Sequence, residues 1–413
     1  MNKGVGSLDR QKERKCMTVE DSINNKKENC CGCYACKNTC PVGAITFEYD
    51  EEGFWYPHVD EGLCVKCGKC VKVCPCVTIP KVLPVKETYA CYAKDKHELM
   101  TSSSGGAFAV LAREVLRKDG YVCGAAFDDN FAVAHKVIHS ENQLNELKGT
   151  KYVQSRIGTV YSEIKTLLVQ NQFVLFSGTP CQVAGLKNYL NREYNNLITV
   201  DLICHGVPSP QVWQDYLGEF SEGKNLTGVS FRNKETGISS PTMDFLFDDG
   251  SSIKTSVSDN LYYKGFINNY YLRPSCFECN FKGLKRCSDI TIGDFWAVKE
   301  YYPEFYSCFG TSAVIIRSNK AYRLFQSATD KLESLKVKAD YLSVWNTHLL
   351  YPASKTDFRK QFYKQKRDFK LSIIINELNQ NEQSISSKTE RFKTKGFDNL
   401  KNRLCSLLKR RRN

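Results

Sequence analysis

From Tyr89 onward the chain alternates short apolar runs with stretches of helical periodicity. Three runs are rich in β-branched and aromatic residues and predict strands: Tyr121–Phe127, Phe173–Phe176 and Leu197–Ile203. The apolar spacing within Val110–Leu116 predicts a helix between them. Strands that alternate with helices are typical of an α/β body, so we expect a mixed α+β or α/β fold here.

Other parts of the chain differ in character. Residues 228–258 predict an antiparallel pair of strands around an Asp249-Gly250 turn. The first residues are polar, and we expect a disordered or loosely attached arm there. The expected division is a polar arm at 1–28, a cysteine-rich domain at 29–80, a mixed body at 88–345 with parts at 88–170 and 171–345, and a helical basic tail at 346–413.

Composition narrows the classes of protein that the chain can belong to. Hydrophobic residues make up 42% of the 413, enough for a proper core. Mean hydropathy is −0.41, and the chain has no apolar run of about 18–20 residues that could span a membrane. The N-terminus lacks the apolar stretch of a signal peptide. We therefore expect a cytoplasmic protein, in which 20 cysteines indicate metal or redox chemistry rather than disulfides.

One cysteine run occurs twice near the N-terminus. It reads Cys-x2-Cys-x2-Cys-x3-Cys-Pro from Cys30 and again from Cys64. In bacterial ferredoxins with this run, three thiolates bind one 4Fe-4S cluster and the fourth binds the other. The expected ligand sets are Cys30, Cys33, Cys36 and Cys74 for one cluster, and Cys64, Cys67, Cys70 and Cys40 for the second. A pair of zinc sites is the alternative, although zinc ribbons show two Cys-x2-Cys hooks instead.

Four further cysteines could form a third metal site. Cys181 and Cys204 each follow a predicted strand, where ligand sites of α/β sheets gather. Cys276 and Cys279 form a Cys-x2-Cys hook. The four suffice for a third 4Fe-4S cluster, with zinc as the rival, and Cys287 could replace one of them.

Net charge does not indicate nucleic-acid binding. The chain carries +13, and ten Lys and Arg against two acidic residues fall within 388–413. This concentration, and the negative charge of thiolate-bound clusters, weaken a nucleic-acid interpretation. Apolar residues at helical spacing in the tail favour peripheral contact with the inner face of a membrane, with a solvated, frayed terminus as the alternative.

The motifs occur in an order that resembles a known family. The double cysteine run is followed by Ser103-Ser104-Gly105-Gly106, then by Gly178-Thr179-Pro180-Cys181-Gln182 and Cys204-His205-Gly206. Cys276-x2-Cys279 and the stretch from Ser288 to Trp296 complete the series. This set, over residues 30 to about 345, resembles the coenzyme F-420 hydrogenase/dehydrogenase beta-subunit family.

The resemblance implies an N-terminal two-cluster ferredoxin domain followed by a mixed-sheet flavin-binding domain. It implies FAD beside a third 4Fe-4S cluster held by Cys181, Cys204, Cys276 and Cys279. The segments that match the flavin site of the family contain Ser103, Ser104, Gly105, Gly106, Lys151, Tyr152, Gln154, Ser155 and Thr179. We expect His205 and Asp294 to handle protons near the flavin; a structural histidine and a turn cap are the alternatives. Arg273 is expected to meet either an anionic substrate or a carboxylate.

The expected function is that of an iron–sulfur flavoenzyme. Clusters carry single electrons and a flavin transfers pairs, so we expect electrons to pass between a ferredoxin-like donor or acceptor and a small-molecule substrate. Bacterial relatives suggest surface-polysaccharide synthesis by analogy. The alternative is an electron-transfer subunit of a larger hydrogenase or dehydrogenase that acts on coenzyme F-420 or on a protein partner.

Overall fold

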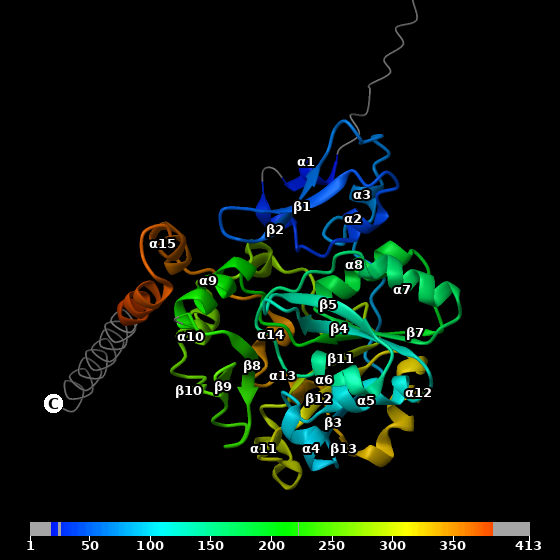
Figure 1. The fold of residues 1–413 in the computed structure, drawn as a ribbon. Helices are drawn as coiled ribbons and strands as arrows, with labels where there is room; N and C mark the ends of the chain where they lie inside the picture. The colour runs from blue at the N-terminus through cyan, green and yellow to red at the C-terminus, as the bar shows by residue number, and fades with distance from the viewer. Residues whose placement is uncertain (1–17, 24–25, 222, 383–413) are drawn as a thin grey trace, which may run out of the picture.

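An eight-stranded mixed sheet forms the centre of the body (Figure 1). The computed structural model describes residues 18–23, 26–221 and 223–382. The strand order is β13-β3-β12-β11-β7-β6-β4-β5, in which β4, β6, β7 and β11 are parallel neighbours and the remaining pairs are antiparallel. The strands are β3 (Glu87–Ala93), β4 (Tyr121–Phe127), β5 (Val133–Ile138), β6 (Val174–Gly178), β7 (Leu197–Leu202), β11 (Ile290–Asp294), β12 (Ser312–Ile316) and β13 (Leu332–Lys336). The predicted mixed α/β class is confirmed.

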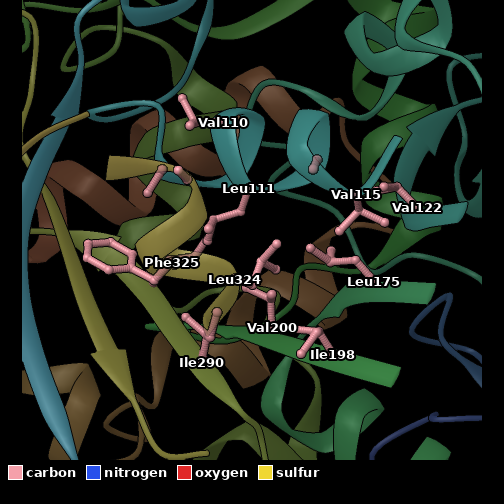
Figure 2. Packing of buried hydrophobic residues seen from close by; sticks show 14 of the residues in the cluster. Val110, Leu111, Val115, Val122, Leu175, Ile198, Val200, Ile290, Leu324 and Phe325 are labelled. Carbon is pink, nitrogen blue, oxygen red and sulfur yellow. The ribbon is translucent and has the colours of Figure 1, made fainter. Parts of the chain in front are cut away.

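Helices cover both faces of this sheet. On one face α5 (Ala107–Leu116) and α12 (Asn319–Ser327) pack against the central strands. On the other, α7 (Val160–Val169) and α8 (Pro180–Leu190) enclose a second apolar cluster. Figure 2 shows the first core, where side chains of the two helices meet those of the strands: Leu111, Val115, Leu324 and Phe325 over Leu175, Ile198, Val200 and Ile290.

A smaller antiparallel sheet lies beside the main one. Its strands are β8 (Leu226–Asn233), β9 (Thr242–Phe247) and β10 (Ser252–Ser256), in the order β10-β9-β8. The predicted Asp249-Gly250 turn joins β9 to β10, and Gly250 has a φ of +77°, which favours glycine. The aromatic core beneath this sheet also contains α9 (Pro210–Phe220) and α10 (Leu261–Ile267).

The cysteine-rich module, drawn blue in Figure 1, lies at one end of the body. It consists of α1 (Val19–Ile23), α2 (Ala35–Thr39), the hairpin β1 (Ile45–Tyr49) and β2 (Trp55–Val59), and α3 (Lys69–Lys72). Val19 is only 2% exposed, and the Glu20 carboxylate accepts a hydrogen bond of 2.7 Å from the backbone N–H of Val59. The expectation of a loosely attached arm is therefore wrong for residues 18–23, because an apolar side chain and a carboxylate anchor them.

Direct contacts fix the module to the body. Arg359 forms two hydrogen bonds, of 2.7 and 2.5 Å, with the two carboxylate oxygens of Glu52. The Ser209 hydroxyl at the start of α9 donates to the carbonyl of Glu52 at 2.7 Å. Asn38 donates its side-chain amide to the carbonyl of Gly158 at 2.8 Å. The module is thus packed in one orientation.

The C-terminal segment continues the body over its described part. Helix α14 (Thr347–Leu350), helix α15 (Phe358–Gln365) and a helical stretch at 371–382 follow the last strand, and Leu371, Ile374 and Leu378 are buried in the aromatic core. These residues do not form a separate tail, because they complete that core. The basic segment at 388–413, with its predicted membrane contact, lies outside the described residues.

The remaining elements are short connections. Within the described ranges, no helix combines the length and apolar character needed to cross a membrane. The other helices are α4 (Lys96–Thr101), α6 (Leu144–Leu147), α11 (Val298–Tyr301) and α13 (Ala339–Ser343), with 3-10 turns η1 (Lys27–Asn29), η2 (Glu141–Gln143), η3 (Pro274–Glu278), η4 (Pro303–Phe305) and η5 (Thr329–Lys331).

Candidate functional site

Four cysteines gather at the outer side of the module. Cys40, Cys64, Cys67 and Cys70 all line one small cavity of about 20 Å³. Cys67 is exposed and the other three are half-buried. The structure therefore brings together the four residues that the repeated cysteine run assigns to the second cluster.

The first cysteine set lies deeper. Cys30, Cys33 and Cys36 are buried where the module meets the body. Gly32, in this loop, has a φ of +66°, and a Cβ there would lie 2.4 Å from Nε2 of Gln154. Only glycine fits this turn against the body. The half-buried Cys74 lies close enough to Cys33 for the two thiols to interact electrostatically.

The third predicted set surrounds a separate cavity of about 180 Å³. Cys181 is at the N-terminus of α8, Cys204 follows β7, and Cys276 and Cys279 come from η3 and the residue after it. All four line the cavity. Burial raises the pKa of the Cys204 thiol to about 12, so a bound metal would be needed to hold it as a thiolate.

The sequence interpretation missed two further thiols at this cavity. Cys31 and Cys76, which the ferredoxin run leaves spare, also line it. The Cys31 thiol lies within hydrogen-bonding reach of the Cys181 and Cys76 thiols. Cys287, the suggested replacement ligand, lies outside this lining and is buried in the core around α7 and α8.

Ligand spacing differs between a single metal ion and a cubane. In the part of the chain that the structure describes, no three or more His, Cys, Asp or Glu side chains are close enough together to hold one ion. A cubane distributes four cysteines over four irons, so its ligands stand farther apart than those of zinc.

A larger cavity of about 520 Å³ adjoins the third cysteine set, in the range of small-molecule and cofactor sites. Most of the predicted cofactor and proton-handling residues line it: Ser103, Ser104, Gly106, Lys151, Tyr152, Ser155, Thr179, His205 and Asp294. Gly105 and Gln154 do not. A Cβ on Gly105 would lie 2.4 Å from the carbonyl oxygen of Cys91, and the Gln154 amide donates to the carbonyl of Cys31 at 3.3 Å.

One end of the large cavity suits an anion. Gly106, with a φ of +85°, precedes α5 and provides no side-chain cap, and the first helical residues, Ala107, Phe108 and Ala109, line the cavity. Lys151 lines the same cavity, and burial lowers its pKa to about 7. Lys234 is fully buried behind the Ser102–Gly106 loop, where it donates to the carbonyls of Leu99, Ser104 and Phe309 at 2.6–2.8 Å. Burial lowers the pKa of Lys234 to about 7 as well.

The lining of the large cavity also contains charged and aromatic groups. Arg232 and Asp294 form an ion pair of 2.7 Å, and the Arg232 guanidinium lies 5.1 Å from the ring centre of Trp296. Trp345, which is 71% exposed, also lines the cavity. Three buried polar atoms of the lining lack a hydrogen-bond partner among the described residues: Ser102 Oγ, Asp294 Oδ1 and His348 Nδ1. Such atoms indicate a polar ligand.

A histidine pair stands between the two cavities. His205 Nε2 lies 2.6 Å from Asn269 Oδ1, and His205 Nδ1 lies 2.6 Å from His348 Nε2. Because an amide oxygen only accepts, a neutral His205 donates from Nε2 and accepts from His348 at Nδ1. Burial lowers the pKa of His205 to about 4, which favours this neutral form.

A second buried histidine supports the floor of the cavity. His135 Nδ1 lies 2.9 Å from Ser155 Oγ, and its Nε2 lies 3.0 Å from the Ser177 carbonyl oxygen. The Gln182 amide donates to the same Ser155 hydroxyl at 3.0 Å. Burial lowers the pKa of His135 to about 4. Neither His135 nor His348 stands in a motif, so the sequence carried no signal for them.

Both sequence interpretations of Arg273 are wrong. The residue is fully buried beneath the module and does not line the large cavity. Its guanidinium donates to Gln154 and to groups of the cysteine-rich module, and within the described ranges no carboxylate forms an ion pair with it. Arg273, which directly precedes η3, packs under the loop that carries Cys30, and this position keeps it away from the large cavity.

Comparison with known proteins agrees with these sites. Residues 172–339 match a family described as the C terminus of the beta subunit of coenzyme F420 hydrogenase/dehydrogenase. Residues 172–339 belong to this family. Residues 29–77 match the 4Fe-4S dicluster domain. The family resemblance and the ferredoxin-type domain predicted from the cysteine run are confirmed.

Curated relatives match separate parts of this chain. One subunit of the F(420)H(2) dehydrogenase of Methanosarcina mazei is 23% identical over 190 residues, which are 42% of this chain and 53% of the relative. One subunit of the NAD(P)H-quinone oxidoreductase of Gloeobacter violaceus is 29% identical over 83 residues, 19% of this chain and 38% of the relative. A ferredoxin of Methanocaldococcus jannaschii is 35% identical over 73 residues, 17% of this chain and 91% of the relative.

The chain thus spans about half the length of the first curated relative. Among solved structures, one protein of the F420-reducing [NiFe] hydrogenase complex from Methanosarcina barkeri has a TM-score of 0.44 and 16% identity, with 65% of this chain and 89% of that protein covered. The matched families and relatives are iron–sulfur and oxidoreductase proteins, so an oxidoreductase-type iron–sulfur role is supported.

Proposed function

We propose that this protein is an iron–sulfur flavoprotein oxidoreductase. It would pass electrons between a small one-electron carrier and a molecule that binds in the large cavity. The observation that carries this proposal is one short segment, which lines two cavities. The residues Cys204, His205, Gly206 and Val207 line both the cavity around the third cysteine set and the large cavity. A cluster held at Cys204 would therefore adjoin whatever occupies the larger space.

The three cysteine sets differ in exposure, and the four cysteines of the third set are half-buried. Cys67 of the outer set is exposed, Cys30 of the inner set is buried, and Cys31 links that inner loop to Cys181 of the third set. Each set supplies four thiols, as a 4Fe-4S cluster requires. We assign one cluster to each set.

We assign the large cavity to FAD. Support comes from its size, from the uncapped start of α5 beside Lys151, and from its unpartnered polar atoms. The helix N-terminus would hold a pyrophosphate, and the Lys151 ammonium, which donates to the carbonyls of Glu146, Lys148 and Gly149, would add positive charge beside it. Tyr152, Phe266 and Trp296 provide aromatic walls for a ring system. A bound flavin exchanges single electrons with clusters and electron pairs with substrates.

His205 and Asp294 are our candidates for proton handling. A neutral His205 accepts at Nδ1 a hydrogen bond from Nε2–H of His348, and His348 Nδ1 has no hydrogen-bond partner among the described residues. Asp294 Oδ1 faces the same cavity without a partner among the described residues, while Arg232 holds the other oxygen in place. Asp294 thus keeps one oxygen available, whereas both ring nitrogens of His205 have partners and His205 would act through His348.

The proposed partner is an acidic one-electron carrier such as a ferredoxin. Residues 62–86 contain five lysines and no acidic residue. Lys66, Lys69 and Lys72 are exposed around the outer set, together with the exposed apolar side chains of Leu63 and Val65. A basic rim around an apolar centre fits an acidic carrier.

The alternative function is that of an electron-transfer subunit. Trp345 and Trp296 are exposed at the large cavity, where a planar coenzyme F420 ring or a partner protein could cover them. The family of residues 172–339 favours this alternative. An autonomous enzyme turns over with reduced ferredoxin and a small substrate, whereas a subunit requires its partner.

The experiment is anaerobic measurement of iron, acid-labile sulfide and flavin per chain, with the optical spectrum. We expect about twelve irons and one flavin, since three cubanes hold four irons each. About eight irons without flavin would overturn the flavoenzyme proposal and leave a two-cluster ferredoxin fused to a binding domain.

A further inference from the structure

Arg273 occupies an unusual position between two proposed clusters. Its side chain is 0% exposed, and it lies three residues before Cys276 of the third set. The guanidinium Nε donates to the carbonyl oxygen of Cys30 at 2.7 Å, and Nη2 donates to the Trp55 carbonyl at 3.1 Å. Arg273, a residue of the body, therefore binds backbone carbonyls of the module next to the inner cysteine set.

One contact reaches a proposed ligand atom. Arg273 Nη2 lies 3.4 Å from Sγ of Cys30, a hydrogen-bonding distance for sulfur. Hydrogen bonds to cluster sulfurs, together with net charge and solvent exposure, set the reduction potential of an iron–sulfur cluster. The bond therefore places a positively charged donor on a ligand sulfur of the proposed inner cluster, where it would affect the reduction potential of that cluster.

The charge of Arg273 has no ordinary counterion. Within the described ranges no carboxylate forms an ion pair with it, and the aromatic rings of Tyr56 and Phe54 lie 4.2 and 5.5 Å from its central carbon. An isolated buried cation is costly. The thiols of Cys30, Cys31 and Cys276 interact with it electrostatically, so bound clusters would supply the missing negative charge.

The surrounding residues hold the guanidinium in one place. Gln154 accepts from Nη1 at 3.1 Å and donates its own amide to the carbonyl of Cys31 at 3.3 Å. A Cβ on Gly32 would lie 3.0 Å from Nη1, so the glycine leaves room for the arginine. Gln154 is therefore part of this arrangement rather than of the large cavity.

We propose that Arg273 is a positioning residue that raises the reduction potential of the inner cluster through its N–H···S bond and its buried charge. Added electrons make a cluster more negative, and a fixed cation stabilises that state. The potential of the inner cluster would then favour electron uptake from the exposed outer set. This inference rests on the proposed cluster assignment.

The test is an EPR-monitored potentiometric titration of the holoprotein, with iron content measured on the same samples. Arg273→Gln removes the charge, and Arg273→Lys keeps the charge but replaces the planar fork that reaches Cys30 Sγ. Arg359→Gln is the matched control, because Arg359 also joins body to module, through Glu52. We expect one of the one-electron transitions to move to lower potential in Arg273→Gln by at least 59 mV, a tenfold change in its reduced-to-oxidised ratio. Arg273→Lys should move it by less, and Arg359→Gln should leave all transitions in place.

Each outcome decides a different point. An Arg273→Gln protein with its full iron content and wild-type potentials overturns the inference. If Arg273→Gln loses iron, Arg273→Lys decides, because a lysine variant that titrates like the wild type leaves no contribution from the bond to Cys30 Sγ. An equal shift in Arg359→Gln overturns it too, because loosening of the joint would then explain the change. A wild-type protein that binds no iron contradicts the proposed function itself, which separates that failure from a failure of the Arg273 inference.

Discussion

Asp294 and Arg232 form an ion pair on the wall of the large cavity, with 2.7 Å between Oδ2 and Nη1. The partners come from β11 and β8, so the pair joins the main sheet to the smaller one. Both side chains are largely buried. Removing one member of a buried pair leaves the other charge uncompensated, which costs far more than the loss of a surface pair.

Asp294→Asn should therefore lower both stability and turnover. We expect the free energy of unfolding to fall by roughly 3–5 kcal/mol, since the Arg232 charge loses its partner. Denaturant unfolding followed by circular dichroism measures this loss. Glu235→Gln, which breaks an exposed pair with Lys254, is the control and should leave the unfolding midpoint in place. Equal effects of the two variants would contradict the role assigned to Asp294.

The basic rim around the outer set predicts a dependence on salt and on charge. Lys69→Glu/Lys72→Glu should reduce kcat/KM for reduced ferredoxin by roughly tenfold or more at low ionic strength, because electrostatic attraction speeds encounter. The effect should shrink as salt screens the charges. Stopped-flow oxidation of reduced ferredoxin measures the rate.

Lys96→Glu/Lys118→Glu changes charge equally on exposed residues of α4 and just after α5, which belong to the body and not to the cysteine-rich module. We expect this control to behave like the wild type. If the two double variants slow the reaction alike, net charge rather than a docking face determines the rate.

The third cysteine set predicts a specific loss of iron. Cys276→Ser should lower the iron content from about twelve to about eight per chain, because one of three cubanes loses a ligand. Cys287→Ser is the matched control, since Cys287 is buried but lies outside the cavity. The ferredoxin-type clusters should survive in both variants. Twelve irons in Cys276→Ser, or eight in Cys287→Ser, would require a different ligand set.

Binding of FAD should weaken with rising pH. Burial lowers the pKa of Lys151 to about 7, so its ammonium is present below pH 7 and lost above it. An anionic pyrophosphate binds the charged form better, and the Kd for FAD should rise above pH 7 by up to about tenfold per pH unit for each linked proton. Fluorescence titration of the apoflavoprotein with FAD measures this slope.

Lys151→Met should reduce that pH slope, and Lys234, with a pKa of about 7, accounts for the remainder. Lys136→Met is the control, because Lys136 is an exposed lysine paired with Glu146. Its slope should match that of the wild type. A Lys151→Met protein with the full slope would exclude Lys151 as the titrating group.

Local patterns allowed much of the fold to be predicted. Tyr121–Phe127 coincides with β4, and the Asp249-Gly250 turn joins β9 to β10. These features depend on neighbouring residues, so the sequence carries their signal. Strand order and the packing of residues 371–382 depend on distant contacts and could not be predicted.

The same distinction holds at the site. The cysteine sets follow from spacing, whereas Arg273, Gln154 and His348 depend on how distant segments meet. Gln154 lies among residues that line the large cavity, yet its own side chain turns toward the cysteine-rich module. The alternation of side-chain directions along a segment does not predict which distant residue a particular side chain will contact.

The contrast between exposed Cys67 and buried Cys30 implies an order of damage in air. Oxygen reaches the outer thiols first, so brief aeration should damage the proposed entry point for an electron carrier before it damages the buried inner set. Such a protein would no longer exchange electrons with a ferredoxin, yet it would still accept electrons from a small artificial reductant. Preparations that are inactive with ferredoxin after handling in air would therefore still contain the inner cluster and would have lost only the outer one.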